Sequence, residues 1–126
     1  MKFPIQDNQL TVELEVFGVV EDLKRKVSGI IDTGFSGYLS LPFMTAFPIG
    51  LILKGQQTYT TADGGTSNYL VCLGTVIFQR RSVVVPIDVQ PSGPILIGVQ
   101  LLKKLDLEMS VQFSKESFQL SPRHSR

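Results

Sequence analysis

The sequence contains only one cysteine, Cys72, and one histidine, His124. A single cysteine cannot form an internal disulfide bond, so a reducing, intracellular environment is the expected one. Cys72 lies in the apolar run Leu70–Phe78, where a thiol usually packs as a small hydrophobic side chain. His124 lies in the polar segment 121–126, which we expect to be frayed. A thiol enzyme, which needs a histidine beside its cysteine, is therefore excluded.

Neither sign of charge dominates, and long apolar runs are missing. The formal net charge is +1, which gives no reason to expect nucleic acid or an anionic membrane as a partner. No apolar stretch approaches the ~20 residues of a transmembrane helix. The first ten residues, MKFPIQDNQL, contain no apolar signal-peptide core. We therefore expect a cytoplasmic protein that binds neither nucleic acid nor a membrane.

Helical periodicity is scarce, and the dominant hydrophobic period is two. The chain of 126 residues suffices for one domain, which we place at residues 1–121, with 122–126 as a flexible tail. Alternating apolar residues at Val12, Leu14 and Val16 predict a half-buried strand. Further strands are predicted at Val27–Ile31, Tyr38–Leu41, on both sides of Asp63-Gly64-Gly65, at Arg81–Val89, Glu108–Phe113 and Ser117–Leu120. Many short strands separated by turns indicate an all-β barrel or sandwich.

One apolar stripe and several proline residues predict where the regular pattern of strands is interrupted. Val99–Leu105 places its apolar residues on one face and its lysines on the other, which predicts a short helix. Pro42 could begin another helical turn, which Pro48 would stop. Pro86 indicates that the strand around it lies at an edge or ends there.

An acidic residue stands at the end of an apolar run in GIIDTGFSGYLSLP, residues 29–42. A carboxylate at the end of a buried strand is costly unless it is hydrogen-bonded, paired or used. The first interpretation of Asp32-Thr33-Gly34 is a local turn, since Asp and Thr cap backbone N–H groups and glycine permits positive φ. The second, a serine nucleophile at Ser36, fails because the motif needs glycine where Tyr38 stands. The third uses Asp32 as acid and base in peptide hydrolysis.

A second element favours the third interpretation. GPILIGVQLLKKL, residues 93–105, reads as a short apolar strand, a glycine at position 98 and a helix. With IIDTGFSGYLSLP, TADGGT and LGTVIF in order along the chain, this sequence resembles the retropepsin-like (clan AA) aspartic proteases of the small prokaryotic type. The resemblance implies an all-β fold, namely a retropepsin-like closed β-barrel with one short C-terminal helix. One chain of this fold would form half of an acid-protease site.

The resemblance also implies a homodimer, in which each chain contributes one Asp32 to a pair on the two-fold axis. The catalytic residues would be Asp32, Thr33 and Gly34, with the Thr33 hydroxyl reaching the partner's loop. The hairpin around Asp63-Gly64-Gly65 would form a flap over a peptide or protein substrate, and its ordinary alternative is a surface hairpin. The implied flap and substrate-binding residues are Phe35, Ala62, Asp63, Gly64, Gly65 and Thr66, and the implied supporting loop contains Ile97 and Gly98. No metal and no cofactor is implied.

Two other functions stay open at this point. A non-catalytic dimeric module that binds a peptide or a protein could keep the same fold and the same triplet, and a purely structural dimer is a more remote possibility. For an aspartic endopeptidase, Phe35, Tyr38 and Leu39 flank the Asp32 pair, and few charged residues lie near it in the sequence. We therefore expect apolar contacts to dominate the specificity of the cleft.

Overall fold

The computed structural model describes residues 1–60 and 62–122. Helices are few and short: α1 (Phe43–Ala46), α2 (Val99–Lys104) and three turns of 3-10 helix, η1 (Glu21–Leu23), η2 (Phe47–Ile49) and η3 (Phe113–Lys115). The strands are β1 (Lys2–Pro4), β2 (Thr11–Phe17), β3 (Arg25–Ile31), β4 (Leu39–Pro42), β5 (Ile52–Thr60), β6 (Thr66–Phe78), β7 (Arg81–Gln90), β8 (Leu96–Ile97), β9 (Leu107–Gln112) and β10 (Ser117–Pro122). The predicted all-β class is confirmed.

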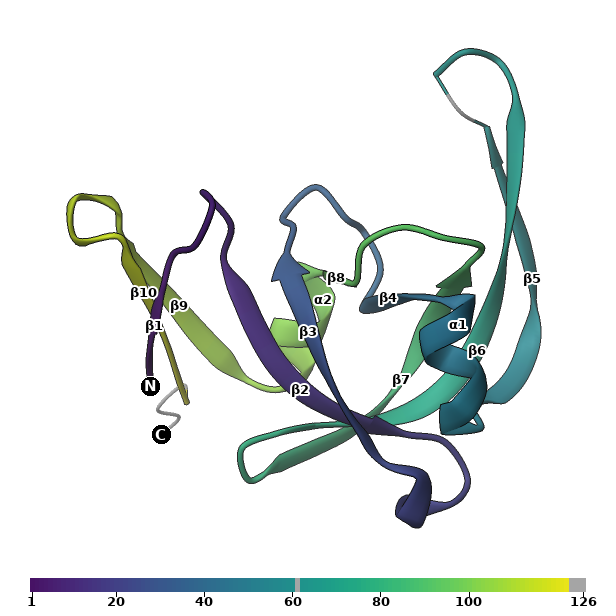
Figure 1. Ribbon diagram of the computed structural model, residues 1–126, viewed down its shortest axis with the longest axis horizontal. Coiled ribbons are helices and arrows are strands. Elements are labelled where there is room, and N and C mark those ends of the chain that lie inside the picture. The colour runs from purple at the N-terminus through teal and green to yellow at the C-terminus, as the bar shows by residue number, and fades with distance from the viewer. Residues whose placement is uncertain (61, 123–126) are drawn as a thin grey trace.

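The larger sheet returns on itself. Its strand order is β2-β3-β8-β4-β7-β6-β5, and an additional pairing joins β2 to β6. Six strands therefore pair in a closed circuit, with β5 outside it (Figure 1). Two of the contacts, β3–β8 and β4–β7, are parallel, and the others are antiparallel. These parallel contacts join segments that are far apart in the sequence, and they hold the loop that follows β3.

A smaller antiparallel sheet has the order β1-β10-β9. Phe3 of β1 stacks on Phe118 of β10, with ring centroids 5.1 Å apart, and lies 6.4 Å from the ring of Phe78 on β6. Phe118 is fully buried. The aromatic cluster of Phe3, Phe78 and Phe118 therefore joins the smaller sheet to the core inside the closed circuit.

Local sequence pattern explains most elements. In β2 the side chains of Val12, Leu14 and Val16 are buried and Glu13 is exposed, so the predicted half-buried strand is confirmed. The predicted helix at Val99–Leu105 is confirmed as α2, which ends one residue earlier, at Lys104. Cys72 is buried in β6, as expected of a small apolar side chain.

The proline predictions have mixed outcomes. A helical segment does follow Pro42, but Pro48 does not stop it, because Pro48 lies in the first turn of η2, where proline needs no N–H partner. Gly50, with φ of 71°, ends the segment instead. Pro86 lies inside β7, not at its end, and pairing with β4 begins only at Ile87. At Pro86 the strand is therefore paired on one side only, as at a sheet edge.

The predicted tail, residues 122–126, begins inside a strand. Pro122, the first residue of the predicted tail, is the last residue of β10. The rest of that tail, with His124, lies outside the described residues, as does Thr61 next to the hairpin tip. None of the helices in residues 1–60 and 62–122 has the length and apolar character needed to cross a membrane.

Candidate active site

Asp32 is the first residue after β3, and the parallel strand β8 fixes its backbone. Ile31 pairs with Ile97, and the Asp32 N–H donates to the Ile97 carbonyl at 2.9 Å. Ile31 and Ile97 are both buried, whereas the Asp32 side chain is half-buried. The apolar run thus ends in the core, and the carboxylate stands at the surface of that core.

A tight turn presents the carboxylate. The Gly34 N–H donates to Asp32 Oδ1 at 2.9 Å, and the Phe35 N–H donates to the Asp32 carbonyl at 3.1 Å. Asp32-Thr33-Gly34 therefore forms a local turn, which the first interpretation of the sequence predicts. Oδ2 accepts no hydrogen bond from the described residues, and Thr33 and Gly34 are exposed. The turn therefore satisfies one carboxylate oxygen and leaves the other available.

Gly98 supports the loop that follows this turn. Its N–H donates to the Tyr38 carbonyl at 2.9 Å. A Cβ atom at Gly98 would lie 2.0 Å from the Gly37 carbonyl oxygen and 3.0 Å from that of Phe35. No side chain has room there, so only glycine lets the start of α2 approach the backbone of the loop so closely. The structure thus places Ile97 and Gly98 under the candidate catalytic segment.

A groove of about 630 Å³ lies beside the loop. The loop contributes Phe35 and Ser36 to it, β4 contributes Ser40, and β7 contributes Asp88 and Gln90. The other lining residues are Ser67, Tyr69, Pro91, Ser92, Gly93, Pro94 and Leu96. Asp32, Thr33 and Gly34 are not part of this lining. A single chain therefore builds a groove beside the loop that follows the candidate catalytic residue Asp32.

Asp88 lines the groove, although no sequence pattern singled it out. It is half-buried on β7, opposite Ser40 of β4 and Val71 of β6. Burial raises the pKa of its carboxyl group above the usual range for aspartate. The only local signal was one acidic residue within a valine-rich run, and nothing in that run shows that the loop and the groove lie beside it.

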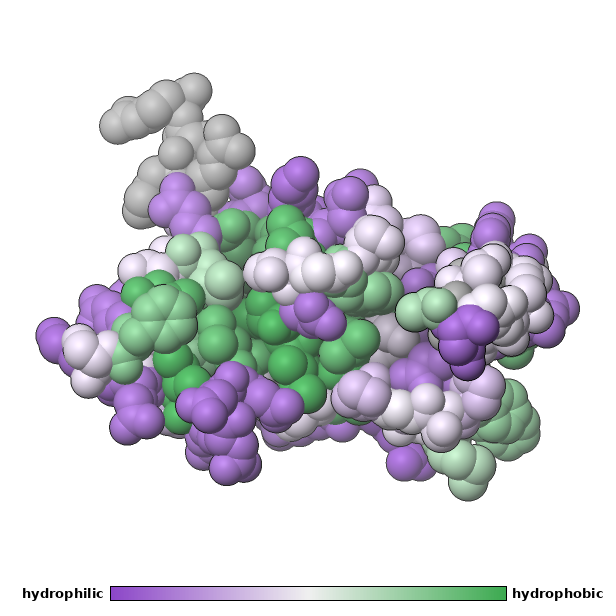
Figure 2. Space-filling view, turned by 90° about the horizontal axis from the view of Figure 1, so that it is seen from above, coloured by the Kyte–Doolittle hydropathy of each residue, from purple (hydrophilic) through white to green (hydrophobic). Residues whose placement is uncertain are grey.

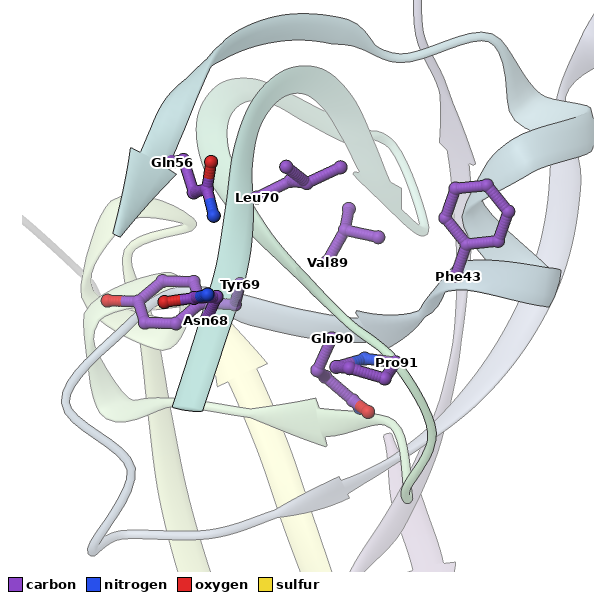
Figure 3. Close-up of a pocket in the computed structure, with 8 residues that line it drawn as sticks. All are labelled: Phe43, Gln56, Asn68, Tyr69, Leu70, Val89, Gln90 and Pro91. Carbon is purple, nitrogen blue, oxygen red and sulfur yellow. The ribbon is translucent and has the colours of Figure 1, made fainter. Parts of the chain in front are cut away.

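A second pocket, of about 400 Å³, adjoins the groove. It shares Tyr69, Gln90 and Pro91 with the groove, and Figure 3 shows Leu70 and Val89 between Phe43 on one side and the polar residues Gln56 and Asn68 on the other. Gln90 Nε2 donates to the Pro94 carbonyl at 3.0 Å, while its buried Oε1 has no partner in the described part of the chain. This pocket is mainly apolar, in contrast to the groove with Asp88.

The β5–β6 hairpin projects from one side of the molecule (Figure 1). At its tip Gly64 has φ of 88°, and the Gly65 N–H donates to Asp63 Oδ1 at 3.1 Å, which is good turn chemistry. Ser67 and Tyr69, nearer the base of the hairpin, line the groove, whereas the predicted flap residues do not. Of the predicted substrate-binding residues, the structure therefore brings Phe35 to the groove and leaves Ala62, Asp63, Gly64, Gly65 and Thr66 at the exposed tip.

Among residues 1–60 and 62–122, neither a metal-binding cluster nor a reactive thiol competes with this location. Burial raises the pKa of the Cys72 thiol, which makes its reactive thiolate scarce. Among the described residues, no three His, Cys, Asp or Glu side chains gather as a possible metal site.

The closed circuit of strands, the Asp-Thr-Gly turn after β3 and the glycine that precedes α2 define a class of fold. The chain has the retropepsin-like fold of the aspartic proteases, so the resemblance seen in the sequence is confirmed for the fold. The small prokaryotic type within that class stays a prediction.

Two solved viral proteases show the likeness. EIAV protease, solved with an inhibitor, is similar over 79% of this chain and 89% of its own, at 15% sequence identity and a TM-score of 0.64. The solution structure of simian foamy virus (mac) protease is similar over 76% of this chain and 94% of its own, at 20% identity and a TM-score of 0.53. No protein-family model matches the sequence, and neither does any curated protein. The likeness is therefore one of fold.

Proposed function

We propose that this protein is an aspartic endopeptidase that works as a homodimer, with one Asp32 from each chain. One observation carries the proposal. In a retropepsin-like fold, Asp32 stands half-buried on a glycine turn, with one carboxylate oxygen held by Gly34 and the other available, and the residues that follow this turn, Phe35 and Ser36, line a groove. Simple capping of a turn needs neither the groove nor the rigid backbone anchor from Ile97.

The chemistry follows from bringing two such carboxylates together. Two carboxylates about 3 Å apart cannot both ionise readily, so the pair shares one proton. The ionised Asp32 takes a proton from a water held between the two, while the protonated Asp32 donates a hydrogen bond to the scissile carbonyl oxygen. The water oxygen attacks the carbonyl carbon. A proton then passes to the amide nitrogen, the C–N bond breaks, and one carboxylic acid and one amine leave.

Three features support a second copy of this chain as the source of the other carboxylate. The sequence contains a single Asp-Thr-Gly triplet, and in the family that it resembles each subunit supplies one. The hydroxyl of Thr33 has no hydrogen-bond partner among the described residues. Figure 2 shows the face seen from above in Figure 1, where apolar side chains gather over the half opposite the β5–β6 hairpin. Exposed apolar area of this kind marks interaction surfaces.

An Asp32→Asn variant tests the proposal. Asn is nearly isosteric and can still accept the Gly34 N–H hydrogen bond, so the turn should persist. It cannot take the proton of the water, and general acid–base catalysis contributes typically about 10²–10⁴-fold. We therefore expect cleavage of a peptide library, read by mass spectrometry, to fall by at least ~10²-fold, while the melting temperature stays the same or rises.

The matched control is Asp22→Asn, which changes an exposed residue of η1 that does not line the groove, and should leave cleavage unchanged. Cleavage by Asp32→Asn at the wild-type rate would mean that Asp32 is only a turn residue. Wild-type protein that binds peptides but cuts none would identify the alternative function, a non-catalytic dimeric module that binds peptides or proteins.

A further inference from the structure

Asp88 lies where its carboxylate meets the groove and the catalytic loop at once. A Cβ atom at Gly37 would lie 3.0 Å from Asp88 Oδ2, so the carboxylate packs directly against the loop that follows Asp32-Thr33-Gly34. The parallel pairing of β4 with β7 puts Asp88 opposite Ser40, which is buried and also lines the groove. Asp88 therefore lies on a strand that is paired on both sides, with β4 and with β6, and not in a loop.

No cationic group of the described residues neutralises this carboxylate. It makes no ion pair or hydrogen bond with the described residues, and burial is the cause of its raised pKa. Of the described residues that line the groove, Asp88 is the only one with a charged side chain. A half-buried carboxylate without a partner costs stability, and Val71, its other cross-strand neighbour, offers no donor side chain. A positively charged group entering the groove would remove that cost.

The rest of the lining suits a long basic side chain. Phe35 and Tyr69 supply aromatic surface, against which the methylene stem of lysine or arginine packs and with which its cationic group interacts favourably. The hydroxyl groups of Ser36, Ser40 and Ser67 offer additional hydrogen-bond acceptors for a cationic head group.

We propose that the groove contains a subsite for one lysine or arginine side chain of the peptide substrate, and that Asp88 is the specificity-determining residue that binds it. The proposal rests on the proposed function in one respect, namely that the occupant is a peptide. It changes the expectation from the sequence that apolar contacts dominate the cleft: those contacts come from Phe35 and the adjoining apolar pocket, and one position of the substrate is basic.

Peptide binding tests this subsite without any need for cleavage. The probes are pairs of fluorescein-labelled octapeptide pools, random except at one position, which is lysine in one pool and norleucine in the other. Binding is measured by fluorescence polarisation on Asp32→Asn protein, which cannot cut the probes if the proposed function holds. We expect the pool with lysine at one position to bind about tenfold more tightly than the pool with norleucine there. The reason is that a hydrogen bond to a charged, half-buried group contributes more free energy than an exposed ion pair does.

Adding Asp88→Asn should abolish the lysine preference and leave norleucine binding unchanged. Asp88→Ser removes the same carboxylate with a smaller side chain and should also abolish the lysine preference. Thermal melting verifies that each variant is folded. The matched control is Glu13→Gln, which removes an exposed carboxylate on β2 outside the groove and should keep the preference.

Equal affinity for both pools at every position would overturn the subsite, as would a lysine preference that survives both Asp88 substitutions, or no binding of either pool. Failure of the proposed function has a different signature: wild-type protein cleaves no library peptide, whatever the polarisation experiment shows.

Discussion

Gly98 stands where the start of α2 meets the loop that carries Asp32, and replacing it with alanine tests how closely the two are packed. The new Cβ would lie 2.0 Å from the Gly37 carbonyl oxygen, far inside an ordinary contact of 3.4–4 Å. Both colliding groups belong to the backbone, so no side chain can rotate away. Either α2 or the loop must therefore move by more than about 1 Å to restore normal contact.

The cost can be estimated from two contributions. Overpacking of this kind costs about 1–3 kcal/mol, and the shift would also strain the 2.9 Å hydrogen bond from the Gly98 N–H to the Tyr38 carbonyl, which is worth about 1 kcal/mol. We expect Gly98→Ala to lower the free energy of unfolding by about 2–4 kcal/mol, which corresponds to a melting temperature lower by roughly 10 °C for a chain of this size.

Urea unfolding of Gly98→Ala, followed by circular dichroism, measures this loss directly. Gly55→Ala on β5 is the matched control, because no atom lies within 4 Å of its added Cβ and its φ is not in the left-handed region. That variant should stay within about 0.5 kcal/mol of the wild type. If Gly98→Ala is equally neutral, then α2 and the loop are not in the tight contact described above, and Gly98 does not position Asp32.

Two further predictions concern Asp88 and the dimer. The Asp88→Asn variant should melt at a higher temperature than the wild type at about pH 7 and at the same temperature at about pH 3. Burial raises the pKa of Asp88, so the folded state loses stability as the pH rises through that pKa, and its neighbours Gly37, Ser40 and Val71 carry no charge that would oppose the effect. An equal difference at both pH values would contradict this explanation. Sedimentation equilibrium should show a dimer, and Thr33→Val should raise its dissociation constant about tenfold, because two symmetry-related hydrogen bonds of ~0.5–1.5 kcal/mol each are lost. A fully active monomer would exclude the paired carboxylates.

Features encoded over a few neighbouring residues could be predicted from the sequence. The alternation in β2, the apolar stripe of α2 and the turn at Asp32-Thr33-Gly34 each depend only on residues that lie close together in the sequence. Pro48 shows the limit of such local rules. The sequence predicts that it ends a helical segment, but it lies in the first turn of η2, and the segment ends at Gly50.

Features that depend on distant pairing could not be predicted. Asp88 joins the groove because β4 and β7 pair in parallel, which brings Ser40 and Asp88 together across 48 positions of the chain. The same holds for the pairing of β2 with β6 that closes the circuit. Arg81, at the start of β7, is a third case, because its guanidinium donates to the Leu105 carbonyl at 2.9 Å, beyond the end of α2. No short window of sequence contains both partners of any of these contacts.

Under the proposed function, binding of the substrate's basic side chain needs only one chain, whereas cleavage of the peptide needs two. Residues of one chain line the groove, including Asp88, and they are fixed by strands of that chain. Asp32 is anchored just as firmly, through Ile97 and Gly34, but it supplies only one of two carboxylates. A single chain should therefore bind the basic side chain of a peptide before it can cut one. Dimerisation then adds the second carboxylate to a site whose substrate contacts are largely in place.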